Sequence, residues 1–186
     1  KVAANLAAAL ARKNPSTGVF LCASEANSVG VAMIDNTGNA EELLGNSPQT
    51  VIVLENDIDT RLGSALLDEV KNLVVIDVMD NPTASRSSIV LPAASFAEAE
   101  GTFINNEGRA QRSMATFRPA GDIAPSYQLL GSLRGDHLPA SGWQQKLAAE
   151  HPSFAGVVTC APDEQFRIEG SRVARMTHRA SGRTAI

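Results

Sequence analysis

The residues best suited to chemistry lie in one stretch, LPAASFAEAEGTFINNEGRAQ, which runs from Leu91 to Gln111. The stretch follows directly on a predicted strand, and open α/β sheets bind their ligands beyond the carboxyl ends of the strands. Gly101 and Gly108 permit a positive φ or a close approach of the backbone to another group. The pair Asn105-Asn106 can turn the chain through the left-handed region and bond to its own backbone.

Charges of both signs also lie close together along this stretch and just beyond it, at Glu98, Glu100, Glu107, Arg109 and Arg112. One interpretation is a loop shaped to hold a large polar cofactor or a neighbouring domain. The other is a hairpin in which Glu107 and Arg109 form a solvated ion pair that contributes little to stability. The residues taken alone favour the hairpin.

Other candidate sites are weak. The glycines are too widely spaced for a dinucleotide fingerprint, and no P-loop is present. His137, His151 and His178 are scattered without metal-ligand spacing, so we expect surface histidines. Ser95 follows a strand but lacks the GxSxG context of a nucleophile. We therefore predict no catalytic, cofactor-binding or metal-ligating residue in this chain.

Cys22 and Cys160 are the two cysteines and lie far apart in the sequence. We expect two buried thiols, although the sequence leaves a disulfide open. An iron–sulfur cluster normally takes four thiolates, so two cysteines do not suffice. Trp143 and Phe154 are expected to be core or docking anchors.

The composition excludes some classes of function. The net charge is -4, which argues against nucleic-acid binding because such proteins usually carry a basic surface. No apolar run reaches the 18 or so residues that a membrane helix needs, so we expect no direct membrane insertion. The Ala-rich start resembles a signal peptide only superficially, since Asn5 interrupts it.

Apolar runs alternate with amphipathic segments over the first half of the chain. The pattern predicts buried strands at 19–23, 51–54, 73–78 and 89–92. Helices are predicted at 2–13, 39–44 and 58–70, the last capped by Asp57 or Asp59. Continuous apolar strands between helices are typical of an α/β fold with a doubly wound, mostly parallel sheet. The short connection at 45–50 leaves open whether residues have been lost there.

The second half of the chain has fewer apolar runs than the first half. We predict a doubly wound α/β domain over residues 1–120, which includes the stretch 91–111. Residues 121–186 are predicted to form a helical and irregular extension that docks on other parts of the protein. It holds short helices at 126–134 and 142–150 and then an arm. The arm carries five arginines that could meet an acidic partner or be solvated, at positions 167, 172, 175, 179 and 183.

The stretch 91–111 closely resembles a signature of the molybdopterin oxidoreductase family, LP…E..GT..N.EGR.Q. The match covers Leu91, Pro92, Glu98, Gly101, Thr102, Asn105, Glu107, Gly108, Arg109 and Gln111. In members that carry the cofactor, the corresponding region lies near a bis-pterin molybdenum group. Two further stretches, VIVLENDI at 51–58 and FRIEGSRVARMTHRASGRTAI at 166–186, are similar to one branch of the family. That branch is the G subunits of bacterial NADH–quinone oxidoreductases (respiratory complex I).

This resemblance implies a non-catalytic structural part of a larger subunit. Such a subunit passes electrons from NADH towards quinone through iron–sulfur clusters that lie outside this chain, and its molybdopterin-like part has lost the cofactor. The implied partners are other domains of the same subunit and neighbouring peripheral-arm subunits, on the cytoplasmic side of the bacterial inner membrane. The missing initiator Met fits a piece of a longer protein. The alternative is a pterin-binding domain of an active molybdenum oxidoreductase, such as a formate dehydrogenase.

Overall fold

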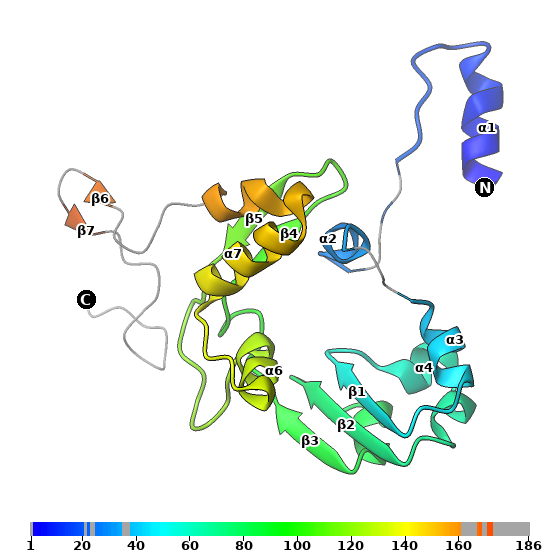
Figure 1. Ribbon diagram of the computed structural model, residues 1–186. Helices are drawn as coiled ribbons and strands as arrows, with labels where there is room; N and C mark the ends of the chain where they lie inside the picture. Colours follow the sequence, from blue (N-terminus) through cyan, green and yellow to red (C-terminus); the bar gives the residue numbers. More distant parts are fainter. Residues whose placement is uncertain are drawn as a thin grey trace.

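The computed structural model describes residues 2–20, 22, 25–34 and 38–160, and the backbone alone at 167–168 and 171–172 (Figure 1). Its helices and strands, in chain order, are α1 Val2–Ala11, α2 Ser28–Ala32, α3 Ala40–Gly45, β1 Thr50–Leu54, α4 Ile58–Leu62, the 3-10 helix η1 Ser64–Leu67, β2 Asn72–Asp77, α5 Pro82–Arg86, β3 Ile89–Pro92, β4 Gly101–Ile104, β5 Ala110–Ser113, α6 Ser126–Arg134, α7 Ala140–Glu150, the 3-10 helix η2 Pro152–Thr159, β6 Arg167–Ile168 and β7 Ser171–Arg172.

A three-stranded parallel sheet, in the order β1-β2-β3, forms the larger unit. Val53 pairs with Val75, which in turn pairs with Val90, so the three strands are in register along one row. The predicted strands at 51–54, 73–78 and 89–92 are therefore confirmed, as is the α/β class with a parallel sheet. Continuous apolar runs of this length are a sound signal because buried parallel strands carry apolar residues on both faces.

The main core lies between one face of this sheet and the helical segments that connect its strands. Val53, Leu73 and Val75 pack there against residues of α3, η1 and α5. Val75 is fully buried and Leu73 is 5% exposed. Burial of this face is the strongest force in this part of the chain, since a fully buried Leu or Val contributes about 1.5–3 kcal/mol.

The helix predicted at 58–70 is wrong in its length. It begins as expected, because Asp57 accepts a hydrogen bond from Thr60 N at 3.3 Å and so caps α4. It then ends at Gly63, whose φ of 98° is incompatible with a helix, and resumes as the short η1. Helical spacing of apolar residues continues across the break, which is why the pattern conceals it.

The strand predicted at 19–23 is also wrong where the structure describes it. Val19 and Phe20 belong to no strand and are 43% and 74% exposed. Cys22 is exposed as well, and Cys160 is half-buried, so the expectation of two buried thiols is wrong. An apolar run becomes a buried strand only where a neighbouring strand pairs with it. Figure 1 instead shows α1 and this segment standing away from the rest of the molecule.

A second cluster of apolar residues lies around the antiparallel pair β4-β5. Ile104, Phe154 and Val157 are buried there, and side chains of α2 and α7 pack against them. The expectation that Phe154 is a core anchor is confirmed. The helices predicted at 126–134 and 142–150 are confirmed as α6 and α7. The division of the chain at residue 120 stays a prediction.

Substitution of Leu73 with Ala should lower the free energy of unfolding by about 3 kcal/mol, because it removes buried methyl groups and leaves a cavity. The matched control is Leu133→Ala, at a side chain that is 60% exposed, and we expect a change within about 0.5 kcal/mol. Urea unfolding followed by circular dichroism measures both. Equal effects at the two positions would show that β2 does not lie in a core.

Candidate functional site at the signature hairpin

The signature begins where β3 ends and is anchored there by a tight turn. Ser95 donates through both its backbone N and its Oγ to Glu98 Oε2, at 3.0 and 2.9 Å. Ala93 and Ala124 form an isolated parallel bridge, which ties the start of the signature to the segment before α6. Ser95 and Glu98 are thus structural partners.

The rest of the signature is a β-hairpin. Gly101 to Ile104 pairs antiparallel with Ala110 to Ser113. At the tip, Asn105 Oδ1 accepts hydrogen bonds from the backbone N of Glu107 and of Arg109, at 3.0 and 2.9 Å. Gly108 has a φ of 76°, which favours glycine. The predicted turn at these residues is therefore confirmed, and the stretch folds as a hairpin.

Only one pair among the five charged residues of this region forms an ion pair in the described structure. Arg112 donates to Glu100 at 2.6 Å across the base of the hairpin, and the Arg112 side chain is only 7% exposed. Glu107 and Arg109 both lie on the exposed tip, and the described structure contains no ion pair between them. The expected pair of Glu107 with Arg109 is wrong because the Asn105 bonds hold the backbone of the tip instead.

The inner side of the hairpin borders a half-open cavity of about 220 Å³. Its wall is mostly apolar and comes from α2, β4, α7 and η2, with Ile34, Ile104 and Phe154 among its residues. Gln144 Nε2 donates to Thr102 Oγ1 at 2.8 Å on this wall and so joins α7 to β4. Partial burial, and secondly the nearby Glu100 carboxylate, raise the pKa of Tyr127, so that its hydroxyl stays protonated here.

The carboxyl edge of the sheet carries several acidic residues, and each is engaged by the protein itself. Glu55 accepts a hydrogen bond from Ser126 Oγ. Asp57 accepts from Thr83 Oγ1 at 2.8 Å. Asp77 Oδ1 accepts from the backbone N of Val78 at 2.6 Å. Among the described residues no group of three or more His, Cys, Asp or Glu side chains could hold a metal ion.

The remaining described candidates lie in or beside α7. His151 stacks edge-on against Phe154, with ring centroids 6.2 Å apart. Trp143 lines the cavity, and the Lys146 ammonium lies 5.1 Å from the centroid of its ring. The side chains of His178 and of the arginines from Arg167 to Arg183 lie outside the described residues.

The sequence comparisons bear directly on this hairpin. A family model described as molybdopterin oxidoreductase matches residues 2–135, which include the parallel sheet, the whole signature and α6. The chain belongs to the molybdopterin oxidoreductase family. The resemblance drawn from the signature is therefore confirmed.

Similar relatives within this family carry one name, that of the G subunit of NADH-quinone oxidoreductase. The chain is 36% identical over 205 positions to the G subunit of Pseudomonas fluorescens, and 37% identical over 207 positions to that of Salmonella typhimurium. Each alignment covers 100% of this chain and 23% of the relative. The chain thus spans about a quarter of the length of these relatives. The alignments are also longer than its 186 residues, so the relatives have residues that this chain lacks.

The family implies a pterin cofactor, and the mostly apolar cavity beside the hairpin does not fit one. Three polar signature side chains, those of Glu98, Thr102 and Asn105, bond to other groups of the chain, whereas those of Glu107, Arg109 and Gln111 are exposed. The cavity of about 220 Å³ is apolar and smaller than the roughly 300–1,000 Å³ typical of cofactor sites. No helix in the described part of the chain is long and apolar enough to span a bilayer.

Substitution of Arg112 with Leu should lower the free energy of unfolding by about 2 kcal/mol, because it leaves the partly buried Glu100 without its counter-ion. The matched control, Arg109→Leu on the exposed tip, should change stability by less than about 0.5 kcal/mol. The double variant Glu100→Gln/Arg112→Leu should regain part of the loss, since no lone charge remains. Urea unfolding checks these three variants and the single variant Glu100→Gln. A loss in the double variant as large as the sum of both single losses would show that the two charges are not coupled.

The bonds at Asp57 predict a pH dependence. Hydrogen bonds from Thr60 and, to a smaller extent, from Thr83 hold the pKa of Asp57 below its usual value. Some desolvation of the carboxylate opposes this effect. A carboxyl whose folded pKa is depressed stabilises the protein above its unfolded pKa and loses that contribution as the pH falls through the folded value. Stability should therefore fall less between about pH 5 and about pH 3 in Asp57→Asn than in the wild type. Asp80→Asn, at an exposed side chain, is the control and should follow the wild type in urea titrations at each pH.

Proposed function

We propose that this chain is a non-catalytic structural part of a G-type subunit of an NADH–quinone oxidoreductase. The observation that carries the proposal is the signature hairpin, in which the side-chain oxygens of Glu98, Thr102 and Asn105 accept hydrogen bonds from other groups of the chain. Similarity to G subunits over the full chain supports the same assignment. The chain by itself performs no reaction in this proposal.

The same reasoning predicts that this chain binds no cofactor. The chain holds no pterin, molybdenum or iron–sulfur group, and the iron–sulfur clusters that pass electrons from NADH towards quinone belong to other parts of the intact subunit. The bonds of Glu98, Thr102 and Asn105 within the chain support this division. Two cysteines, one exposed and one half-buried, also do not supply the four thiolates of a cluster.

The proposed partners are other domains of the same subunit and neighbouring subunits of the peripheral arm, at the cytoplasmic side of the bacterial inner membrane. Relatives that form part of a multi-subunit oxidoreductase support this placement. The exposed apolar side chains also support it, since surfaces of this kind mark protein contacts. They include Phe96 at 83% and Met79 at 69%.

A direct test is to analyse the purified chain for bound groups. We expect molybdenum and iron to be far below one atom per chain by elemental mass spectrometry, and a denatured extract to show no pterin fluorescence. An active molybdenum oxidoreductase, purified from the same host, serves as the positive control. One pterin or one molybdenum per chain would overturn the proposal in favour of a cofactor-binding domain of an active molybdenum enzyme.

The structural role itself needs a second measurement. The aligned segment of the Salmonella typhimurium G subunit is replaced by this chain, and assembly of the enzyme and NADH-driven quinone reduction are measured in membranes. We expect both to survive the exchange, and the destabilised Leu73→Ala version to lose assembly and activity in equal proportion. Loss of activity in a fully assembled enzyme would contradict a purely structural role.

A further inference from the structure

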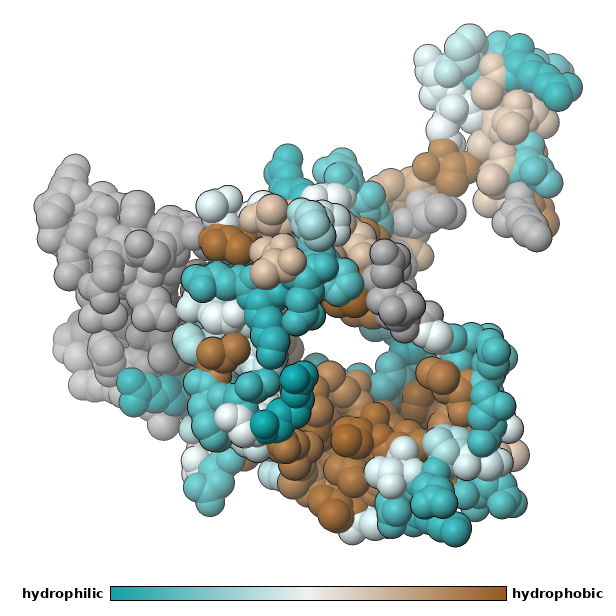
Figure 2. Space-filling model, in the orientation of Figure 1, coloured by the Kyte–Doolittle hydropathy of each residue, from teal (hydrophilic) through white to brown (hydrophobic). Residues whose placement is uncertain are grey.

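The sheet β1-β2-β3 has one face that no described helix covers. Ile52 and Leu54 of β1 point to that face and are 49% and 43% exposed, in alternation with the buried Val53. The register adds to the same face Val74 and the fully buried Ile76 of β2, and Ile89 and Leu91 of β3. Figure 2 shows the result as a continuous hydrophobic area over the three strands. Ile76 is already covered, and we call the other five residues, which are all at least partly exposed, the open face. Parallel sheets are almost always covered on both faces, so the open face lacks a cover.

Helix α1 also carries apolar side chains that nothing covers in the described structure. Val2, Leu6 and Leu10 recur every four residues and so form one stripe along the helix, and they are 83%, 59% and 48% exposed. No residue of α1 is buried. Most of its other residues are Ala, whose small side chains let a helix approach a sheet closely. Helices of this length are marginal without tertiary packing, so α1 itself needs a surface on which to rest.

We propose that the open face is the docking site of α1 of the same chain. The connection leaves α1 at Ala11 and reaches α2 at Ser28, and a chain of that length spans up to roughly 50 Å. Each strand of the sheet is only about 20 Å long. The tether therefore allows α1 to fold back from the position in Figure 1 and to lie along the strands.

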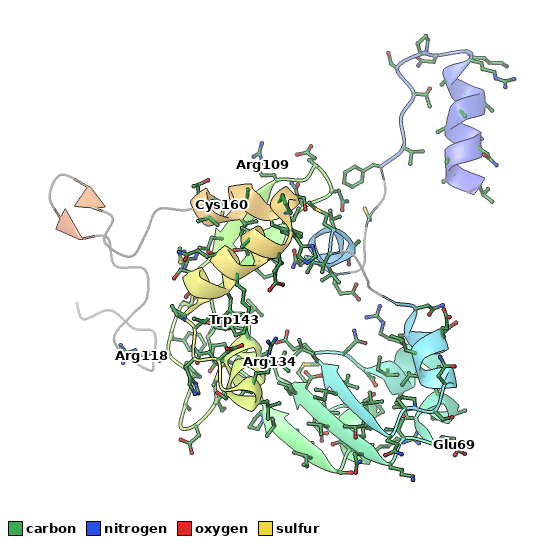
Figure 3. All side chains as sticks on the ribbon, in the orientation of Figure 1. Glu69, Arg109, Arg118, Arg134, Trp143 and Cys160 are labelled. Carbon is green, nitrogen blue, oxygen red and sulfur yellow. The ribbon has the colours of Figure 1, made fainter. Side chains whose placement is uncertain are left out.

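Charge is compatible with this docking. The helix contains no charged residue, so docking buries no charge, and Arg12 and Lys13 follow directly after its end. Glu69 is exposed beside the amino end of β2, at the edge of the sheet marked by its label in Figure 3. An α1 that runs antiparallel to the strands places the two cations at the same edge as Glu69.

The first test measures the distance between α1 and the sheet. In a Cys22→Ser/Cys160→Ser background of the 186-residue chain, nitroxide labels are attached at Asn5→Cys and Lys71→Cys, and their separation is measured by pulsed electron paramagnetic resonance. We expect one narrow distance distribution, at the same distance when the labelled chain is diluted with unlabelled chain. A broad distribution would overturn the proposal. A narrow distance that disappears on dilution would assign the open face to a second copy and would overturn it as well.

The second test removes the stripe. Leu6→Glu/Leu10→Glu should broaden the distance distribution and raise the fluorescence of the apolar dye ANS several-fold, because the open face is uncovered. The matched control is Ala4→Glu/Ala8→Glu, which adds the same charges on the opposite side of α1 and should leave both signals unchanged. Identical behaviour of the two variants would overturn the proposal. Failure of the structural role in NADH–quinone oxidoreductase would leave these readouts unaffected, so the two proposals fail separately.

Discussion

The burial of one face of a short parallel sheet is the interaction on which the rest of the described structure depends. Val53, Leu73 and Val75 hold the strands against α3, η1 and α5, and so align the carboxyl ends of β1, β2 and β3. The signature stretch starts from that edge, and its position is fixed only because β3 is fixed. Ser126 reaches back to Glu55 at the same edge and connects the second apolar cluster to the sheet. Loss of the sheet would therefore leave the hairpin without an anchor.

Much of this arrangement could be predicted from the sequence, and the reasons for the failures are physical. The strands at 51–54, 73–78 and 89–92 are readable because each is a continuous apolar run between turn residues. The run at 19–23 has the same appearance, yet a run forms a strand only beside a partner strand, and no local pattern encodes that partner. The break at Gly63 is hidden in the same way, because apolar spacing continues across a glycine whose φ is set by the whole fold.

The candidate site is predictable in outline and not in its contacts. Asn105, Gly108 and the alternating polar residues indicate a hairpin, and the hairpin is observed. The partners that hold it in place come from distant parts of the chain: Gln144 bonds to Thr102, and Asn27 Oδ1 accepts from Ile104 N at 2.9 Å. The pairing of Arg112 with Glu100, rather than of Arg109 with Glu107, depends on which strand positions face each other across the ladder. Composition and short-range spacing do not contain that information.

A family signature is usually taken as a sign of the family's cofactor, but folding alone accounts for four of the ten residues matched here. Gly108 supplies a positive φ, Asn105 closes the tip, Glu98 caps the turn after β3, and Thr102 binds α7. Each of these roles would be needed by the hairpin whether or not a pterin lay beside it. Residues whose hydrogen bonds are already satisfied inside the chain offer little to a ligand, because binding would first have to break those bonds. The signature therefore identifies how this segment folds, and the choice between a scaffold and a cofactor site rests on which polar groups the fold leaves free.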